Sequence, residues 1–197
     1  MTQQRGLLVV IAGPSGVGKG TVHTRVREAL PESTLSISAT TRSPRPGEVE
    51  GVHYRFVDRE GFDQLVGGNE LYEWAEYAGH SYGTPRRPAR EAVARGQVVV
   101  LDIELQGALQ IKEQDPDALL VFLVPPSFEE LERRLRGRGT EDDAAVARRL
   151  ERAREELAEG DRFDVQVVND DLDRCVEEVL AAIDHARTSP PHHPWDR

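Results

Sequence analysis

The stretch "GPSGVGKGT", residues 13–21, decides the fold of this chain. It directly follows the apolar run "GLLVVIA", residues 6–12, which is typical of a buried parallel strand. A glycine-rich loop between such a strand and a helix points several backbone N–H groups at one anion, and the helix dipole adds to the attraction. Lys19 adds a mobile positive charge for the outer phosphates of a nucleotide. We therefore predict a phosphate-binding loop.

One position departs from the usual pattern G-x-x-x-x-G-K-[ST], because Gly20 stands where a hydroxyl is expected. The hydroxyl comes one residue later, on Thr21. A glycine-rich turn with a solvated lysine is the alternative, and the agreement of strand, loop and helix argues against it. The residues that we expect to bind ATP in this loop are Gly13, Pro14, Ser15, Gly16, Val17, Gly18, Lys19, Gly20 and Thr21.

The composition fits a globular protein and excludes several classes. A chain of 197 residues is expected to form one domain, and it has no apolar run of about 18 residues that would cross a membrane. The net charge of −10 makes it a poor nucleic-acid binder, so we expect neither nucleic-acid nor membrane partners. The lone Cys175 rules out an internal disulfide and allows a reducing compartment, so we expect a cytoplasmic location.

Predicted strands and helices alternate along most of the chain, which favours an α/β fold with a central parallel sheet flanked by helices. The expected strands are 6–13, 34–38, 97–104, 118–126 and 163–170. The expected helices are 19–30, 59–67, 85–96, 127–139, 143–157 and 172–186. Two further strand-like segments, 53–57 and 71–83 with a turn at Gly79, break the alternation and indicate a small β-rich insert.

These assignments divide the single domain into parts with different expected roles. We expect the core at about 5–37, 85–136 and 156–187, the insert at about 38–84, an Arg-rich lid at about 137–155 and a disordered tail at about 188–197.

A second anion site is expected in the segment "SATTRSPRPGEVEGVHY", residues 38–54. Arg42 and Arg45 stand three residues apart in a loop that two prolines constrain, and Tyr54 follows. Arginine forks match phosphate oxygens in a bidentate manner, so a phosphate acceptor fits this loop. Two solvated surface arginines are the alternative, which the rigidity of the loop makes less favourable.

Taken together, the motifs resemble the guanylate kinase family. The blocks that carry the resemblance are "GPSGVGKGT", "ISATTRSPRPGEVEGVHY", "LYEWAEYAGHSYGT", "VLDIELQGA", "LERRLRGRGTE" and "VVNDDLD". They occur in the order found in that family and span about residues 6–185. The form "GKGT" is also seen in several kinases of nucleoside monophosphates, in which phosphates and water hold most of the metal. The resemblance thus implies a P-loop kinase fold with a GMP-binding insert and a lid.

The resemblance also implies a role for each matching residue. The guanine base would be bound by Ser38, Glu73 and Thr84. The GMP phosphate would be held by Arg42, Arg45, Tyr54 and Tyr82, with Asp102 at the floor of the site. The lid cations that close on ATP would be Arg134, Arg138 and Arg149, and Asn169 would lie near the adenine. The residues expected to act in catalysis are Lys19, Arg42, Arg138 and Arg149.

Glu73 has a chemical reason to select guanine. Guanine presents two adjacent donors, N1–H and the amino group, and one carboxylate can accept both. Adenine offers an acceptor instead of N1–H, and an unpaired buried polar group costs about 1–3 kcal/mol. One position departs from the family pattern, because Glu104 stands where the second of two aspartates is common, and its role stays open.

The expected reaction is transfer of the γ-phosphoryl group of ATP to GMP or dGMP with Mg²⁺ as the cofactor. We expect Mg²⁺ to be held mainly by phosphates and water, near Thr21, with no direct protein ligand assigned. Two alternatives remain, namely a related kinase of another small phosphate ester and a non-catalytic guanylate kinase-like protein-binding module. The intact loop with Lys19 disfavours the second. The oligomeric state is undecided.

Overall fold

The computed structural model describes residues 5–77, 79–137 and 143–189. Its central element is a five-stranded sheet of order β2-β7-β1-β8-β9, in which every pairing is parallel. The strands are β1 (Leu7–Ala12), β2 (Thr34–Leu35), β7 (Val98–Asp102), β8 (Leu119–Val124) and β9 (Val165–Val168). Parallel strands need crossover connections, and helices form these along most of the chain. The carboxyl ends of all five strands therefore meet at one edge, where open α/β sheets bind their ligands.

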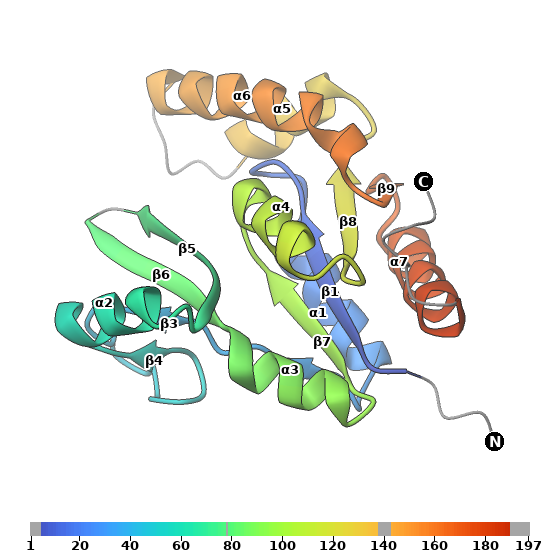
Figure 1. The fold of residues 1–197 in the computed structure, drawn as a ribbon. Coiled ribbons are helices and arrows are strands. Elements are labelled where there is room, and N and C mark those ends of the chain that lie inside the picture. Colours follow the sequence, from blue (N-terminus) through green and yellow to red (C-terminus); the bar gives the residue numbers. More distant parts are fainter. Residues whose placement is uncertain (1–4, 78, 138–142, 190–197) are drawn as a thin grey trace.

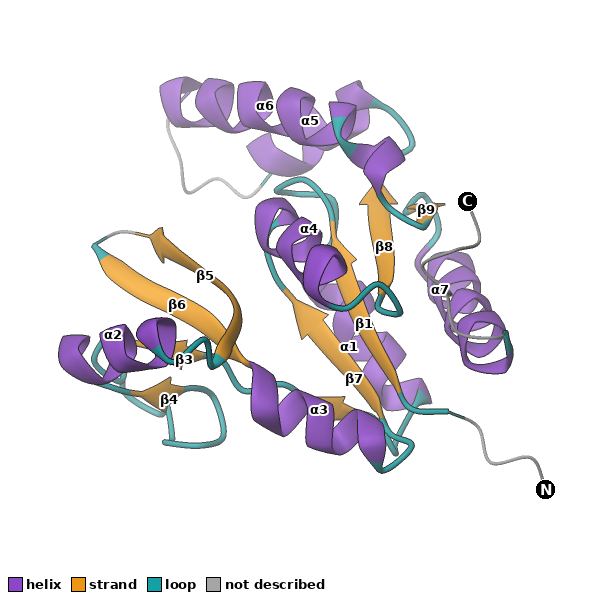
Figure 2. Ribbon diagram, viewed as in Figure 1, coloured by secondary structure: helices purple, strands orange, loops and turns teal. Residues whose placement is uncertain are grey.

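Helices cover both faces of this sheet, as Figures 1 and 2 show. Helices α1 (Lys19–Ala29) and α7 (Leu172–Thr188) pack on one face, and α3 (Arg86–Ala94) and α4 (Leu105–Gln114) pack on the other. Because side chains alternate across a strand, Val9 and Ile11 of β1 face α1 and α7, whereas Leu8 and Val10 face α3 and α4. The strand is buried at every position, which explains why it reads as a continuous apolar run.

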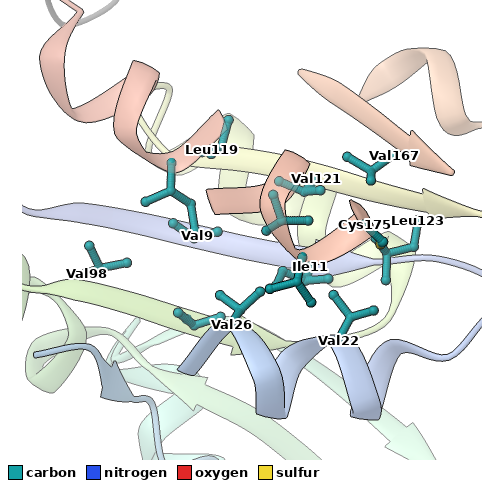
Figure 3. Packing of buried hydrophobic residues seen from close by; sticks show 14 of the residues in the cluster. Val9, Ile11, Val22, Val26, Val98, Leu119, Val121, Leu123, Val167 and Cys175 are labelled. Atoms are coloured by element: carbon teal, nitrogen blue, oxygen red, sulfur yellow. The ribbon is translucent and has the colours of Figure 1, made fainter. Parts of the chain in front are cut away.

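The larger apolar cluster lies between the sheet and the helices α1 and α7 (Figure 3). Val22 and Val26 of α1 are one turn apart and reach Ile11 and its neighbours. Cys175 of α7 belongs to the same cluster, and burial raises the pKa of its thiol to about 11. This packing fixes the start of α1, and with it the loop that precedes the helix.

A second, four-stranded sheet of order β4-β3-β6-β5 stands apart from the first (Figure 1). It consists of β3 (Ala39–Thr40), β4 (Arg55–Phe56), β5 (Leu71–Tyr77) and β6 (His80–Pro85), with helix α2 (Arg59–Gly67) packed beside it. Phe62 and Leu65 of α2 fill a small core against Ala39 and Leu71. The Asp58 carboxylate accepts from Gly61 N–H and caps α2.

Helices α5 (Phe128–Arg136) and α6 (Asp143–Ala158) form a further layer, followed by the short 3₁₀ helix η1 (Gly160–Arg162). The Ser127 hydroxyl accepts from Glu130 N–H and caps α5, as its sequence predicts. Leu131 and Leu135 of α5 pack against Val146 and Leu150 of α6. This pair of helices lies beside the phosphate loop, because a Cβ at Gly16 would lie 2.8 Å from Leu135.

The predicted parallel sheet with helices on both faces is confirmed, and so are the helices expected to begin at about residues 19, 59, 85, 127, 143 and 172. Several details differ, and the strands expected at 34–38 and 53–57 are shorter, at Thr34–Leu35 and Arg55–Phe56. A helix at Leu105–Gln114 was not expected, β3 lies within a predicted loop, and Thr188 belongs to α7 rather than to the tail. The Thr188 hydroxyl donates to Asp184 O and stabilises that last turn. Ser189 is the C-cap of α7, and residues 190–197 of the predicted tail lie outside the described residues.

The part of the chain that the structure describes holds no helix with the length and apolar character that crossing a bilayer requires.

Strand β1 is buried on both faces, so shortening one of its side chains should destabilise the fold. Val9 is completely buried, so Val9→Ala should lower the free energy of unfolding by about 2 kcal/mol through lost burial and a cavity. Val168 of β9 is 41% exposed, and Val168→Ala is the matched control, with an expected change below about 0.5 kcal/mol. Urea unfolding followed by circular dichroism measures both. Equal losses in the two variants would contradict the assignment of β1 as the centre of the core.

Candidate active site

The phosphate loop begins at the carboxyl end of β1 and ends in the first turn of α1. Gly13, Gly16 and Gly18 have φ angles of 153°, 91° and 104°, a region that favours glycine. At Gly13 a side chain is also sterically excluded, because a Cβ would lie 2.6 Å from Leu123 O. Gly20 differs, since a Cβ there would meet nothing within 4 Å. The glycines that shape the loop are thus present, and Gly20 changes only the side chain that is offered to a ligand.

The first turn of α1 offers its backbone N–H groups to an anion. Gly18 precedes the helix and provides no side-chain cap, so no capping oxygen occupies the space in front of it. Lys19 Nζ donates to Gly13 O at 2.8 Å and folds back over the loop. Thr21 is exposed on the same turn. This arrangement suits a phosphate at the helix N-terminus.

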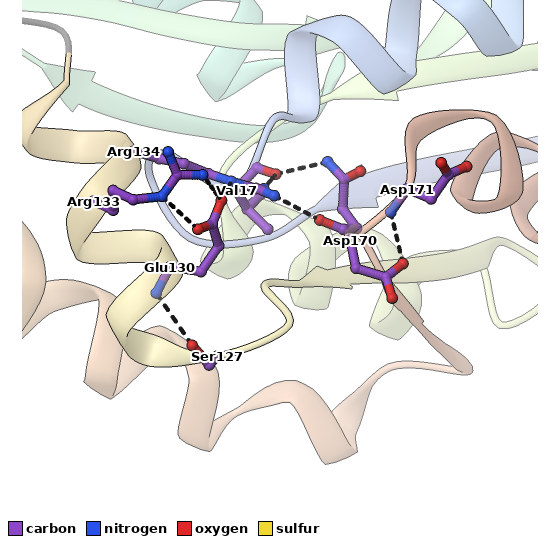
Figure 4. A network of polar contacts seen from close by, with 8 residues as sticks. Val17, Ser127, Glu130, Arg133, Arg134, Asp170 and Asp171 are labelled. Carbon is purple, nitrogen blue, oxygen red and sulfur yellow. Dashed lines mark hydrogen bonds and ion pairs between the residues drawn. The ribbon is translucent and has the colours of Figure 1, made fainter.

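The carbonyl oxygen of Val17 ties the loop to two distant segments (Figure 4). It accepts from Asn169 Nδ2 at 2.7 Å and from Arg134 at 3.2 Å. Arg134 also donates to Asn169 O and to the Glu130 carboxylate, whose pKa its two arginine partners, Arg133 and Arg134, lower to about 2. Arg134 and Asn169 therefore hold the backbone of the phosphate loop at Val17, near the place where an adenine is expected.

Of the other predicted lid cations, one can be placed. Arg149 of α6 donates to the Ser15 hydroxyl in the phosphate loop. The contact joins the lid helix directly to the loop that is predicted to hold ATP. Arg138 lies outside the described residues, as does the rest of the stretch 138–142.

The second predicted anion site contains a compact turn, and in this site the Arg42 side chain is largely buried and Arg45 is exposed. Arg45, Pro46, Gly47 and Glu48 form a type II turn, with Glu48 N–H donating to Arg45 O and Gly47 at a φ of 88°. The Glu48 carboxylate accepts from the Arg42 guanidinium at 2.8 Å and from Arg45 N–H at 2.7 Å. These two donors, the Arg42 guanidinium foremost, lower the pKa of Glu48 to about 2.

Aromatic rings surround the Arg42 guanidinium. Its central carbon lies 5.4 Å from the centre of the Tyr54 ring and 5.9 Å from that of Phe56, within the range of cation–π attraction. The Tyr82 ring meets Tyr54 edge-on, with 6.1 Å between ring centres. The predicted phosphate-binding residues Arg42, Tyr54 and Tyr82 thus lie together, and Arg45 lies on the adjoining turn.

Glu73 is a buried carboxylate on β5, only 9% exposed. The Thr84 hydroxyl donates to its Oε1 at 2.6 Å, and Gly107 of α4 makes room for it, because a Cβ there would lie 3.1 Å from the carboxylate. Burial raises the pKa of Glu73, and the hydrogen bonds from Thr84 oppose the shift. A buried carboxylate whose lone pairs are not all used in hydrogen bonds costs stability. It is well suited to bind two adjacent N–H donors of a ligand.

A cavity of about 270 Å³ joins the two sheets and contains the remaining predicted residues. Ser38, Tyr54 and Thr84 line it from the four-stranded side, and Asp102 lines it from the end of β7. Asp102 is also the register partner of Ile11 in β1, just before the phosphate loop. One side of the cavity therefore lies at the carboxyl edge of the large sheet, the edge from which the phosphate loop also starts.

Sequence reasoning missed several residues of this cavity, notably His23 and Arg27 of α1, Ser36 and His53. His23 is buried, and burial lowers its pKa while the nearby Asp102 opposes the shift. Lys19, His23 and Arg27 follow one another at intervals of four residues, which places all three on one face of α1. This spacing is the sequence signal from which His23 and Arg27 could have been assigned to the site. Glu104, whose role was left open, pairs with Arg152 of α6 at 2.9 Å on the surface.

The donor groups fit a metal that arrives with nucleotide phosphates. Within the described residues, no group of three or more His, Cys, Asp or Glu side chains is arranged to hold an ion. The exposed Thr21 hydroxyl in the first turn of α1 and the exposed Asp102 carboxylate at the end of β7 are oxygen donors, the type that Mg²⁺ prefers.

Comparison with known proteins agrees with this geometry. The family model described as guanylate kinase matches residues 5–186. The chain belongs to the guanylate kinase family. A guanylate kinase of Thermobifida fusca is 56% identical over 89% of this chain and 90% of its own length, and one of Thermosynechococcus vestitus is 52% identical over 92% and 95%. The crystal structure of guanylate kinase from Anaplasma phagocytophilum superposes with a TM-score of 0.74 at 32% identity, covering 96% of this chain and 90% of that one.

In this member of the guanylate kinase family, the burial of the Glu73 carboxylate should make the stability of the fold depend on pH. Its pKa is raised in the folded state, so the folded chain resists ionisation and loses stability as the pH rises through that raised pKa. Glu73→Gln keeps the acceptor for Thr84 and removes the buried charge. The variant should melt above the wild type at pH 7, and the difference should shrink below pH 4.5.

Thermal unfolding followed by circular dichroism at both pH values measures this difference. Glu113→Gln on α4 is the matched control, because that carboxylate is exposed. A variant with Glu73→Gln that is less stable than the wild type at pH 7 would show that the buried charge is fully compensated.

Proposed function

We propose that this protein transfers the γ-phosphoryl group of ATP to GMP or dGMP, giving ADP and GDP, in purine nucleotide metabolism. The observation that carries the proposal is the buried Glu73 carboxylate, which accepts from Thr84. Thr84 lines the same cavity as Asp102, and Asp102 lies at the end of β7 beside β1, the strand that leads into the phosphate loop. Membership of the guanylate kinase family supports the same reaction.

Base recognition in this proposal depends on Glu73, Thr84 and Ser38. One Glu73 oxygen accepts from Thr84, and the carboxylate keeps lone pairs for guanine N1–H and the amino group. Adenine would turn a lone pair toward this carboxylate and leave it unpaired in a buried place. The site therefore selects by the cost of an unsatisfied charge as well as by attraction.

Catalysis in this proposal is a matter of position and charge. A GMP phosphate oxygen attacks the γ-phosphorus in line, and no covalent enzyme intermediate is required. Lys19 and the α1 N-terminus hold the donor phosphates, while Arg42 and Arg45 hold the acceptor phosphate. Mg²⁺, held by the phosphates and water near Thr21, would neutralise part of the charge on the donor. Surrounding two anionic substrates with cations lowers their mutual repulsion in the transition state.

The lid completes this arrangement when both substrates are bound. Arg149 already contacts Ser15, so its charge stands beside the donor loop before closure. We propose that Arg149, together with Arg138, moves onto the transferring group as α6 closes, and that closure excludes water as a competing acceptor. The insert at about 38–84 would close from the opposite side.

Two other functions compete with this one. A kinase of another small phosphate ester would need the same loop and the same Arg42 site, and Glu73, Ser38 and membership of the guanylate kinase family argue against it. A protein-binding module of guanylate kinase type would not need the shaped phosphate loop, whose glycines and lysine are all in place here.

The decisive experiment is a substrate panel. With ATP and Mg²⁺, the wild-type protein should release ADP rapidly with GMP or dGMP and at least about a hundredfold more slowly with AMP, UMP or a sugar phosphate. Lys19→Ala should abolish turnover and keep GMP binding in calorimetry, because the two sites lie on different segments. Equal turnover with AMP would favour the ester kinase, and absence of turnover despite GMP binding would favour the binding module.

A second prediction separates phosphate binding from base recognition. Arg42→Ala removes charge-assisted hydrogen bonds worth about 1.5–3 kcal/mol, so kcat/KM for GMP should fall about tenfold to a hundredfold. The ratio of GMP to AMP activity should not change, because both carry the same phosphate. Glu73→Gln replaces one acceptor oxygen by an NH₂ donor, so this ratio should shrink.

Steady-state kinetics of the wild type and the two variants, each with GMP and with AMP, give the three ratios. Arg87→Ala, on the exposed side of α3, is the control for loss of one positive charge. A ratio that changes in Arg42→Ala and not in Glu73→Gln would reverse the roles assigned to the two residues.

A further inference from the structure

One carboxylate in the Arg42 site has no place in the proposed chemistry. Glu48 lies between the two arginines that are expected to bind the acceptor phosphate. One of its oxygens accepts from the Arg42 side chain and the other from the Arg45 backbone N–H. A negative charge at this place repels a phosphate, so its presence requires an explanation.

The contacts of Glu48 explain the shape of the site. Its backbone N–H closes the turn onto Arg45 O, and its side chain returns to Arg45 N–H, so both backbone polar groups of Arg45 are held by this one residue. The same carboxylate fixes the Arg42 guanidinium, whose side chain is only 10% exposed and lies near Tyr54 and Phe56. Glu48 thereby sets the relative positions of the two arginines.

Arg42 can bind Glu48 and a phosphate at the same time. A guanidinium carries five N–H donors. Glu48 takes one and Ser43 O takes another, and the Tyr82 hydroxyl also contacts the group. Donors remain for phosphate oxygens, so the carboxylate need not leave when the ligand arrives. A side chain held in its binding conformation loses less conformational entropy on binding than a free one.

We propose that Glu48 is a positioning residue for the acceptor phosphate, which holds Arg42 and the Arg45 backbone in the arrangement that binds it and remains in place in the complex. The proposal rests on the proposed function, because it takes this phosphate to be that of GMP. It opposes the simpler interpretation that the carboxylate occupies the phosphate position and competes with the ligand.

The two interpretations predict opposite effects of Glu48→Gln. The amide keeps the length and one acceptor oxygen, loses the charge, and turns an NH₂ donor toward Arg42 or Arg45 N–H. If Glu48 positions the arginines, GMP should bind about tenfold or more weakly. If Glu48 competes with the phosphate, GMP should bind more tightly.

Guanosine, which lacks the phosphate, separates this effect from general damage to the insert. We expect the affinity for guanosine, measured by displacement, to change less than twofold in Glu48→Gln. In kinetics KM for GMP should rise, while kcat and KM for ATP should stay within about twofold. Glu50→Gln is the matched control, because its carboxylate accepts from Phe56 N–H in the same exposed loop and contacts neither arginine in the described residues. It should leave GMP and guanosine binding unchanged.

Three results would overturn the proposal, namely unchanged or tighter GMP binding in Glu48→Gln, an equal loss for GMP and guanosine, or an equal effect of Glu50→Gln. Failure of the proposed function has a different signature, since the wild type would then bind AMP as well as GMP. In that case the same comparison between AMP and adenosine still tests the role of Glu48 at the phosphate.

Discussion

The carbonyl oxygen of Val17 is the point on which the candidate site depends. Two side chains from distant segments, Asn169 after β9 and Arg134 in α5, donate to this one atom in the phosphate loop. A glycine-rich loop has a high conformational entropy when it is free, and its N–H groups converge on an anion only if the backbone is fixed. The bond network therefore couples the order of the loop to the folding of the carboxyl edge of the sheet and of α5.

The sequence predicts those parts of the fold that depend on local patterns. The buried strand β1, the glycines of the loop and the cap Ser127 each have a signal within a few residues, and the structure has them where the patterns place them. The residue pattern itself indicates a phosphate site at Arg42, Arg45 and Tyr54, and the family resemblance implies the other candidate site residues from Ser38 to Asp102. The structure was needed to show that Ser38, Tyr54, Thr84 and Asp102 line one cavity, because this depends on how the two sheets are placed.

What the sequence missed depends on contacts between distant residues. Helix α4 was not expected over 105–114, a segment that contains a helix-weakening glycine, Gly107. The structure shows why that glycine is there, since Glu73 from the other sheet lies against it. Strand β3 exists only through pairing with β4 and β6, and the role of Glu48 requires the turn to be folded. None of these contacts leaves a periodic pattern in the sequence.

The burial of Cys175 has a practical consequence for the study of motion in this protein. Its thiol is the only one in the chain, belongs to the apolar cluster beneath α7, and has a pKa raised to about 11. Thiolate, rather than thiol, reacts with maleimides and other electrophiles, so this cysteine is nearly inert at neutral pH while the protein is folded. New cysteines at exposed positions such as Val52 in the insert and Arg154 in α6 will therefore accept a pair of fluorophores without removal of the native one. Energy transfer between the two dyes then reports the distance between insert and lid in the otherwise unaltered chain.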